Sequence, residues 1–68
     1  MTYDEYLNEV DRTNTRHPEW RYGQTLFNVL HVHRPDLSEQ VRGTKIDPFY
    51  KYTYNAIHPF LTFVRENW

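Results

Sequence analysis

The chain has 68 residues, with eight Lys and Arg against nine Asp and Glu and a net charge of -1 at pH 7. A balance so close to neutral gives no bulk attraction toward nucleic acid or anionic lipid. A chain of this length supports one hydrophobic core, so we expect a single domain over residues 1–68. Cysteine is absent, which excludes disulfides and fits a reducing compartment.

The N-terminal segment is polar and acidic from Met1 to Glu5. A signal peptide would need a basic start followed by an apolar run. The longest uncharged stretches are far shorter than the roughly 20 apolar residues that a membrane span requires. We therefore expect a cytoplasmic protein without a membrane partner.

Residues 2–5 match the capping box that starts an α-helix. In this motif the Thr2 hydroxyl accepts from the backbone N–H of the third helical residue, and the Glu5 side chain reaches back to the cap. The sequence predicts a first helix that begins here and fades between residues 13 and 17, where Thr-Asn-Thr weakens helix propensity. Its apolar face has helical spacing and consists of Tyr3, Tyr6, Leu7 and Val10.

A second helix is predicted from about residue 18 to residue 33. Pro18 suits the first turn of a helix, where its missing N–H would have no partner. Gly23 costs about 1 kcal/mol against alanine inside a helix, so we expect a close helix crossing or a ring contact over it; the alternative is a tolerated surface glycine. The predicted buried side consists of Trp20, Leu26, Phe27, Val29 and Leu30.

A short third helix is predicted after Pro35. Asp36 and Glu39 offer a second capping box at its start, and Gly43 is placed to end it in a left-handed turn. Asp47-Pro48 then repeats the pattern of a cap followed by a proline, which predicts a single further turn.

Rings alternate with polar residues over residues 50–54, a period of two that would also fit a strand. An isolated strand has nothing to pair with here, so we interpret the segment as an extended, tyrosine-rich loop. Asn55 is predicted to cap the last helix, with Pro59 within the first four positions, whose N–H groups lack helical partners. The fold class is therefore all-α, a compact small bundle of three main helices plus one short helix. The apolar face of the last helix consists of Ile57, Phe60, Leu61, Val64 and Trp68.

No pattern in the sequence builds a catalytic or metal site. His31 and His33 lie two apart, which points them to different sides of a helix, and no pattern of Cys or His-Glu-x-x-His completes a metal site. We interpret them as a pair near the negative end of the helix dipole. Ser38 is the only serine, and its acidic neighbours are explained by capping. The carboxylates at positions 4, 5, 9 and 11 fit a solvated face better than catalytic pairs or a phosphate mimic. We expect no enzyme activity, cofactor or metal.

The tyrosine-rich loop is the candidate binding site. Tyr, Trp and Arg carry much of the energy of protein interfaces, so we predict a protein-binding surface there. Two other interpretations stay open: rings beside cations also suit single-stranded nucleic acid, and one or two of the rings would be enough to pin the loop to the core. The predicted surface consists of Tyr50, Lys51, Tyr52, Tyr54 and Arg21.

Three short motifs stand out in the middle of the chain: Gly-Gln-x-x-Phe-Asn from Gly23, Arg-Gly-Thr from Arg42 and Asp-Pro-Phe-Tyr from Asp47. Together they resemble a family of small uncharacterised proteins that phages and prophages encode. The resemblance covers residues 3–65, and residues 51–54 look like a local elaboration of a connection that is shorter in the family. No activity is known for the family, so the resemblance implies no site residues.

The resemblance implies an accessory factor in the cytoplasm of the host cell that binds a host or phage protein stoichiometrically. Such binding would inhibit or redirect a host enzyme or a defence system. Two alternatives belong to other classes: a small nucleic-acid-binding module, whose affinity falls steeply with salt, and a self-associating structural protein such as a homodimer, whose melting temperature depends on concentration.

The motif residues also have a purely structural interpretation. Arg21, Gln24 and Asn28 form a polar strip at helical spacing, which either hydrogen-bonds the turn at residues 42–44 or forms the binding surface. Arg42 lies near a predicted helix C-terminus, where the dipole favours a cation, and it is expected to pair with Asp47.

Overall fold

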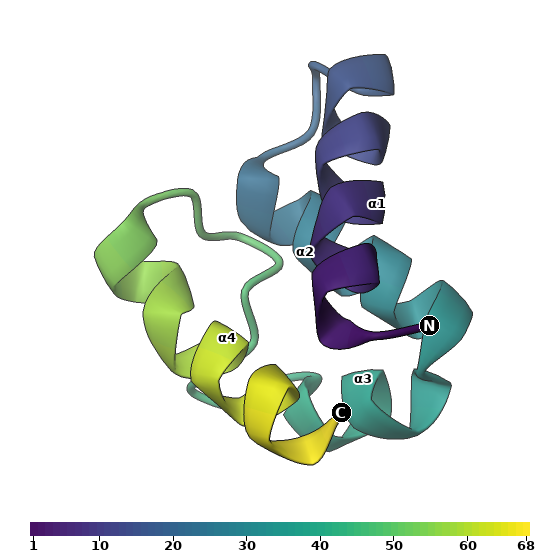
Figure 1. Ribbon diagram of the computed structural model, residues 1–68. Helices are drawn as coiled ribbons and strands as arrows, with labels where there is room; N and C mark the ends of the chain where they lie inside the picture. Colours follow the sequence, from purple (N-terminus) through teal and green to yellow (C-terminus); the bar gives the residue numbers. More distant parts are fainter.

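The computed structural model describes all 68 residues and contains four α-helices and no strand: α1 (Tyr3–Arg16), α2 (Tyr22–His33), α3 (Pro35–Val41) and α4 (Tyr54–Asn67). The all-α class, with three main helices and one short helix, is confirmed. Figure 1 shows α1 upright in front of α2, with α3 and α4 lower in the view and the chain rising between α4 and α2 before α4 begins. None of the four helices combines the length and the apolar character that a membrane crossing needs.

The start of α1 is the capping box that the sequence predicts. The Glu5 backbone N–H donates to Thr2 Oγ1 at 3.1 Å, and the Thr2 backbone N–H donates to Glu5 Oε1 at 2.7 Å. The second of these bonds holds the pKa of the Glu5 carboxyl below its ordinary value. The helix ends at Arg16, inside the interval that the sequence predicts.

The start of α2 is where the sequence prediction is wrong. The helix begins at Tyr22 rather than near Pro18. A turn occupies the intervening residues, because the Trp20 backbone N–H donates to the His17 carbonyl oxygen at 3.0 Å. The Trp20 ring also stacks on the His17 ring, with centroids 3.9 Å apart. Stacking and the turn together keep this segment out of the helix.

The boundaries of α3 agree with the sequence, but its predicted capping box does not form. Arg34 is the N-cap and makes no side-chain capping bond. The two carboxylates are engaged elsewhere: Asp36 accepts two bonds from Arg34, at 3.1 and 3.0 Å, and Glu39 pairs with Arg42 at 3.1 Å. Gly43 follows the helix with φ of 73°, which confirms the predicted left-handed turn.

The start of α4 differs from the prediction by its cap and by the position of its proline. Thr53 Oγ1 accepts from the Ala56 backbone N–H at 3.4 Å, so Thr53 is the N-cap and Asn55 lies in the first turn. Pro59 lies inside the helix, beyond the four positions whose N–H groups lack partners. It therefore removes one bond from the helical ladder.

The core lies where α1, α2 and α4 meet over α3. Tyr6 is its largest fully buried side chain, and its hydroxyl donates to the Leu26 carbonyl oxygen at 2.7 Å. Burial raises the pKa of Tyr6 well above its ordinary value, because the phenolate would be desolvated there. The remaining buried side chains of the core are Val10, Leu26, Phe27, Val29, Leu30, Leu37, Val41, Ile57, Phe60 and Val64.

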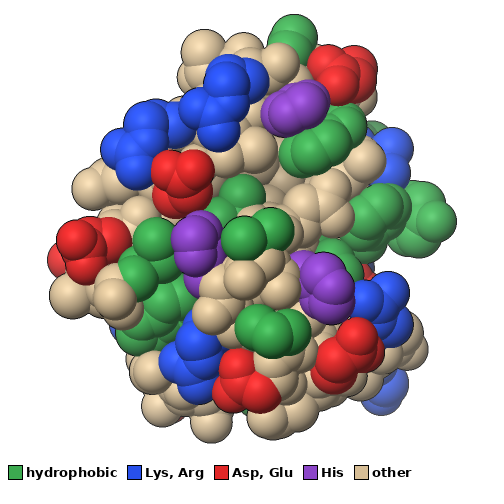
Figure 2. Space-filling model, turned by 90° about the vertical axis from the view of Figure 1, so that its right-hand side faces the viewer, with side chains coloured by type: hydrophobic (Ala, Val, Ile, Leu, Met, Phe, Trp, Pro, Cys, Tyr) green, Lys and Arg blue, Asp and Glu red, His purple; other side chains and the backbone are tan.

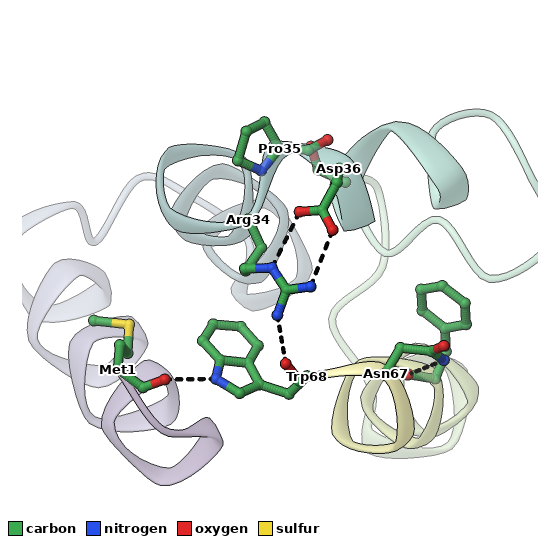
Figure 3. Close-up of polar contacts among 8 residues, drawn as sticks. Met1, Arg34, Pro35, Asp36, Asn67 and Trp68 are labelled. Atoms are coloured by element: carbon green, nitrogen blue, oxygen red, sulfur yellow. Dashed lines mark hydrogen bonds and ion pairs between the residues drawn. The ribbon is translucent and has the colours of Figure 1, made fainter.

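The two ends of the chain meet in a cluster of Met1, Arg34, Asp36 and Trp68, which we call the terminal clasp (Figure 3). The Trp68 indole N–H donates to the Met1 carbonyl oxygen at 2.7 Å, and its ring stacks on Tyr6 with centroids 5.2 Å apart. The Arg34 guanidinium lies 5.3 Å from the Trp68 ring centroid and donates to the Trp68 carbonyl oxygen. Its bonds to Asp36 hold the pKa of that carboxyl below its ordinary value.

Candidate functional site

The turn before the tyrosine-rich loop is held by the carboxylate of Asp47. Its two oxygens accept from the backbone N–H groups of Gly43, at 2.7 Å, and Phe49, at 3.0 Å. A bond from the Lys51 N–H to the Pro48 carbonyl oxygen at 2.8 Å closes the single turn that the sequence predicts. Asp47 is thus engaged by the backbone, and the predicted pair between Arg42 and Asp47 is replaced by one between Arg42 and Glu39.

Gly23 fixes the loop against α2. Its backbone N–H donates to the Lys51 carbonyl oxygen at 2.9 Å. A Cβ atom at this position would lie 1.9 Å from the Pro48 carbonyl oxygen and 2.3 Å from that of Lys51, so only glycine fits. The close contact predicted over Gly23 is therefore present, but its partner is the backbone of the loop rather than a helix or a ring.

Tyr50 and Tyr52 lie in this loop and Tyr54 is the first residue of α4, and all three side chains are exposed. Tyr50, Tyr52 and Tyr54 expose 78, 71 and 69% of their surface. The interpretation in which these rings pin the loop to the core is therefore wrong. Phe49 has that role instead, because its ring meets the edge of the buried Phe27 ring with centroids 6.0 Å apart.

The two cations predicted beside the tyrosines lie in different surroundings. The Arg21 guanidinium lies 5.1 Å from the Tyr50 ring centroid, and its Nε donates to the Phe49 carbonyl oxygen at 3.3 Å. Lys51 folds back on its own loop, where its Nζ donates to the Lys45 carbonyl oxygen at 2.7 Å. The structure thus brings Arg21 to Tyr50 and turns the Lys51 ammonium toward the preceding turn.

The polar strip of α2 does not bond the turn at residues 42–44. Arg21 donates to the loop after that turn, and Asn28 lines an open groove. The prediction that this strip hydrogen-bonds the turn at residues 42–44 is therefore wrong. Two of its three members face the surface that includes the tyrosines.

That groove is the feature that sequence reasoning misses. It has a volume of about 510 Å³, within the range of roughly 300–1,000 Å³ typical of ligand pockets. It lies between α2 and the chain that follows α3, and Tyr50 is one of its lining residues. We call it the aromatic groove; its lining residues are Trp20, Phe27, Asn28, His31, Arg42, Asp47, Phe49 and Tyr50.

Cations and polar atoms lie on the walls of the aromatic groove. The Arg42 guanidinium is 5.1 Å from the Phe27 ring centroid, and the His31 ring stacks on the same phenylalanine at 6.3 Å. His31 Nδ1 lies 2.9 Å from Ser38 Oγ, whose hydroxyl donates to the Pro35 carbonyl oxygen.

No local pattern in the sequence predicts the groove. Its rings come from residues 20 and 27 on one side and from residues 49 and 50 on the other, and a helical or strand period does not report such a pairing. A smaller hollow of about 240 Å³ shares Trp20 and Asn28 with it and extends along α1 and α2. No group of three or more His, Cys, Asp or Glu side chains is placed to hold a metal ion.

Comparison with known proteins adds no relative to this description. No protein-family model matches the chain, and neither a curated protein nor a solved structure matches it. Function is therefore inferred from the geometry of the tyrosine-rich loop and the aromatic groove.

Proposed function

We propose that this protein acts by stoichiometric binding of a partner protein through the tyrosine-rich loop, rather than by catalysis. The observation that carries the proposal is the exposure of three large rings within five residues, each above two thirds of its surface. Tyrosine gives large, rigid contact area at a low cost in side-chain entropy, because it has only two side-chain torsions. Rings of this kind are enriched among the residues that dominate interface energies.

The backbone of the loop is also ordered in the free protein, which favours binding. Gly23 and Arg21 donate to the carbonyl oxygens of Lys51 and Phe49, and the Asp47 carboxylate accepts from the Phe49 backbone N–H, so the backbone of residues 49–51 is held in place. A segment that is already ordered loses less conformational entropy on association than a floppy one. The loop therefore resembles a preformed interface more than a connection that is tolerated at the surface.

The charge distribution favours a protein over nucleic acid as the partner. Nucleic-acid binding draws on a continuous basic stripe, whereas this chain has a net charge of -1. On the face drawn in Figure 2, acidic and basic side chains alternate, with histidines and hydrophobic groups between them. The resemblance to phage-encoded proteins supports a host or phage protein as the partner, in the host cytoplasm, with inhibition or redirection of a host enzyme or defence system as the outcome.

The test is affinity capture from host-cell lysate, with and without nuclease, using the natural chain and a variant with Tyr52→Ser and Tyr54→Ser. We expect one stoichiometric protein that survives nuclease and is lost with the variant, while the melting temperature is unchanged because both rings are exposed. Val32→Ser removes a side chain that is 74% exposed elsewhere on the surface, and it should retain the partner.

Other outcomes contradict the proposal. Recovery that vanishes with nuclease would replace the protein partner by nucleic acid. A melting temperature that rises with protein concentration would indicate self-association. Retention of the partner by the double variant would place the interface elsewhere on the molecule.

A further inference from the structure

Resting on the proposed function, a more specific inference concerns the chemistry of the partner. We propose that the aromatic groove and Arg21 bind an acidic peptide segment, which places an aromatic side chain in the groove and a neighbouring carboxylate on the Arg21 guanidinium. The site then recognises two features of the peptide, an aromatic ring and a negative charge.

The first support is an arginine that lacks an anion. Four arginines of the chain pair with carboxylates within the molecule: Arg12, Arg16, Arg34 and Arg42. Arg21 makes one hydrogen bond, from Nε to a carbonyl oxygen, and no ion pair. Arg21 is half-buried, and its guanidinium lies beside the Phe49 and Tyr50 rings, 5.9 and 5.1 Å from their centroids. The remaining N–H groups of this fork suit a carboxylate, which accepts two parallel bonds.

The second support is the charge around the loop. Lys45, Lys51 and Arg21 have no carboxylate partner in the molecule. Asp47 is the carboxylate on the same loop, and both of its oxygens accept backbone N–H groups. The charge of Arg42 is balanced by Glu39. An acidic segment would therefore meet more uncompensated cations than anions on this part of the surface.

The third support is the shape and chemistry of the groove. A volume of about 510 Å³ accommodates a single aromatic side chain with part of its backbone. Phe49 already contacts both Phe27 and Tyr50 edge to face, with centroid distances of 6.0 and 5.0 Å. One more ring extends this arrangement, since edge-to-face pairs are favourable beyond the area that they bury. The Arg21 guanidinium lies beside Phe49 and Tyr50, which line the groove, so the ring and the carboxylate of the ligand are neighbours.

The same surface suits a peptide better than a nucleic-acid strand. A strand carries a phosphate at every nucleotide, and Asp47, the carboxylate in the lining of the groove, would repel some of these phosphates. A peptide varies its charge from residue to residue, so it can present a carboxylate to Arg21 and a neutral ring to the groove.

The test uses three pentapeptides with blocked ends and a central phenylalanine, flanked on both sides by glutamate, glutamine or lysine. Binding is followed by NMR on the folded protein, through the indole N–H signals of Trp20, which lines the groove, and Trp68, which lies in the terminal clasp. We expect the glutamate peptide to shift the Trp20 signal and leave the Trp68 signal in place. The glutamine peptide should bind more weakly, and the lysine peptide weakest of all.

Variants assign the charge recognition to Arg21. Arg21→Gln should weaken the glutamate peptide about tenfold, because a charge-assisted fork is lost, and it should barely affect the glutamine peptide. Arg65→Gln removes the same charge from another arginine that makes no ion pair, so it controls for net charge and should leave the affinity unchanged. Arg21→Lys keeps the charge without the fork and should fall between the two.

Each alternative result has a definite meaning. Equal or tighter binding of the lysine peptide would overturn the inference, as would tighter binding of an oligothymidylate than of the glutamate peptide. If no peptide binds while a captured partner still depends on Tyr52 and Tyr54, the inference fails and the proposed function stands. If the glutamate peptide binds at the groove and no partner is captured, the proposed function fails and the site stands.

Discussion

The terminal clasp and the tyrosine-rich loop use the same pair of groups in different ways. Each places an arginine over an aromatic ring, at 5.3 Å for Arg34 over Trp68 and 5.1 Å for Arg21 over Tyr50. Arg34 also donates two bonds to the Asp36 carboxylate and one to a carbonyl oxygen. Arg21 donates one bond to a carbonyl oxygen and meets no carboxylate.

The difference shows how the high aromatic content of this chain is divided. In the clasp the ring is stacked, hydrogen-bonded and covered by a cation whose charge is balanced, so the cluster contributes to stability. At the loop the rings are exposed and the cation has no counter-ion, so the folded chain leaves the same kind of contact incomplete. Under the proposed function, a binding partner completes it.

The largest expected effect is loss of the clasp through Trp68→Ala. The indole packs against the core and on Tyr6 and donates to Met1. Its removal should cost about 3 kcal/mol, the lower end for a buried aromatic truncated to alanine, and lower Tm by about 15 °C. Urea unfolding followed by circular dichroism measures the change.

Trp20→Ala is the matched control from the other region. Trp20 stacks on His17 and lines the groove without packing against the buried core. It should cost less than about 1 kcal/mol, as surface substitutions do. Equal losses for the two tryptophans would contradict the division between a stabilising and a binding region.

A smaller loss of stability is expected from Gly23→Ala, which disrupts the contact between the loop and α2. The added methyl would overlap the Pro48 and Lys51 carbonyl oxygens, so the loop must move away from α2, at a cost of about 2 kcal/mol. Amide hydrogen exchange of Phe49 should also become faster. Gly43→Ala is the control, because a Cβ there meets no atom within 4 Å. It should cost about 1 kcal/mol through its positive φ without loosening the loop.

Tyr6→Phe, a change in the core, should lower stability less than Trp68→Ala and Gly23→Ala do. Loss of the bond to the Leu26 carbonyl oxygen should cost about 1 kcal/mol at pH 7. The raised pKa of Tyr6 predicts a further effect. Above about pH 10 the unfolded chain releases this proton and the folded chain keeps it, so the stability of the natural chain falls as pH rises.

Urea midpoints between neutral and alkaline pH check both parts of this prediction. The variant should start lower and lose less stability on the alkaline side. A residual loss is expected from Tyr3 and Tyr22, whose pKa values burial also raises. An unchanged alkaline slope in the variant would show that Tyr6 is not the group responsible.

Much of the fold could be predicted because its signals are local. Thr2 and Glu5 bond each other three residues apart, and Gly43 acts on its own backbone. Where two local signals compete, the sequence does not decide between them. Thr53 and Asn55 are both good caps, and Arg42 has carboxylates at Glu39 and Asp47. Backbone hydrogen bonds settle the partner of Arg42, because Asp47 is engaged by two backbone N–H groups and Glu39 is free to pair.

The candidate site was predictable only in part, for the same reason. Alternating rings with no strand partner indicate an exposed loop, and the tyrosines are exposed. The groove depends on contacts between distant segments, such as the bond from Arg21 to Phe49 across 28 residues. The need for glycine at position 23 likewise comes from a loop that lies far along the chain. Contacts between such distant segments produce no periodic pattern in the sequence.

The bond between Trp68 and Met1 makes the folded chain almost a ring. A short peptide linker would join residue 68 to residue 1 with little distortion, and closing the chain covalently lowers the entropy of the unfolded state. Figure 1 places this junction at the opposite end of the molecule from the tyrosine-rich loop. A cyclic form, or a fusion at either end, would therefore present the loop to solvent on the far side of the domain.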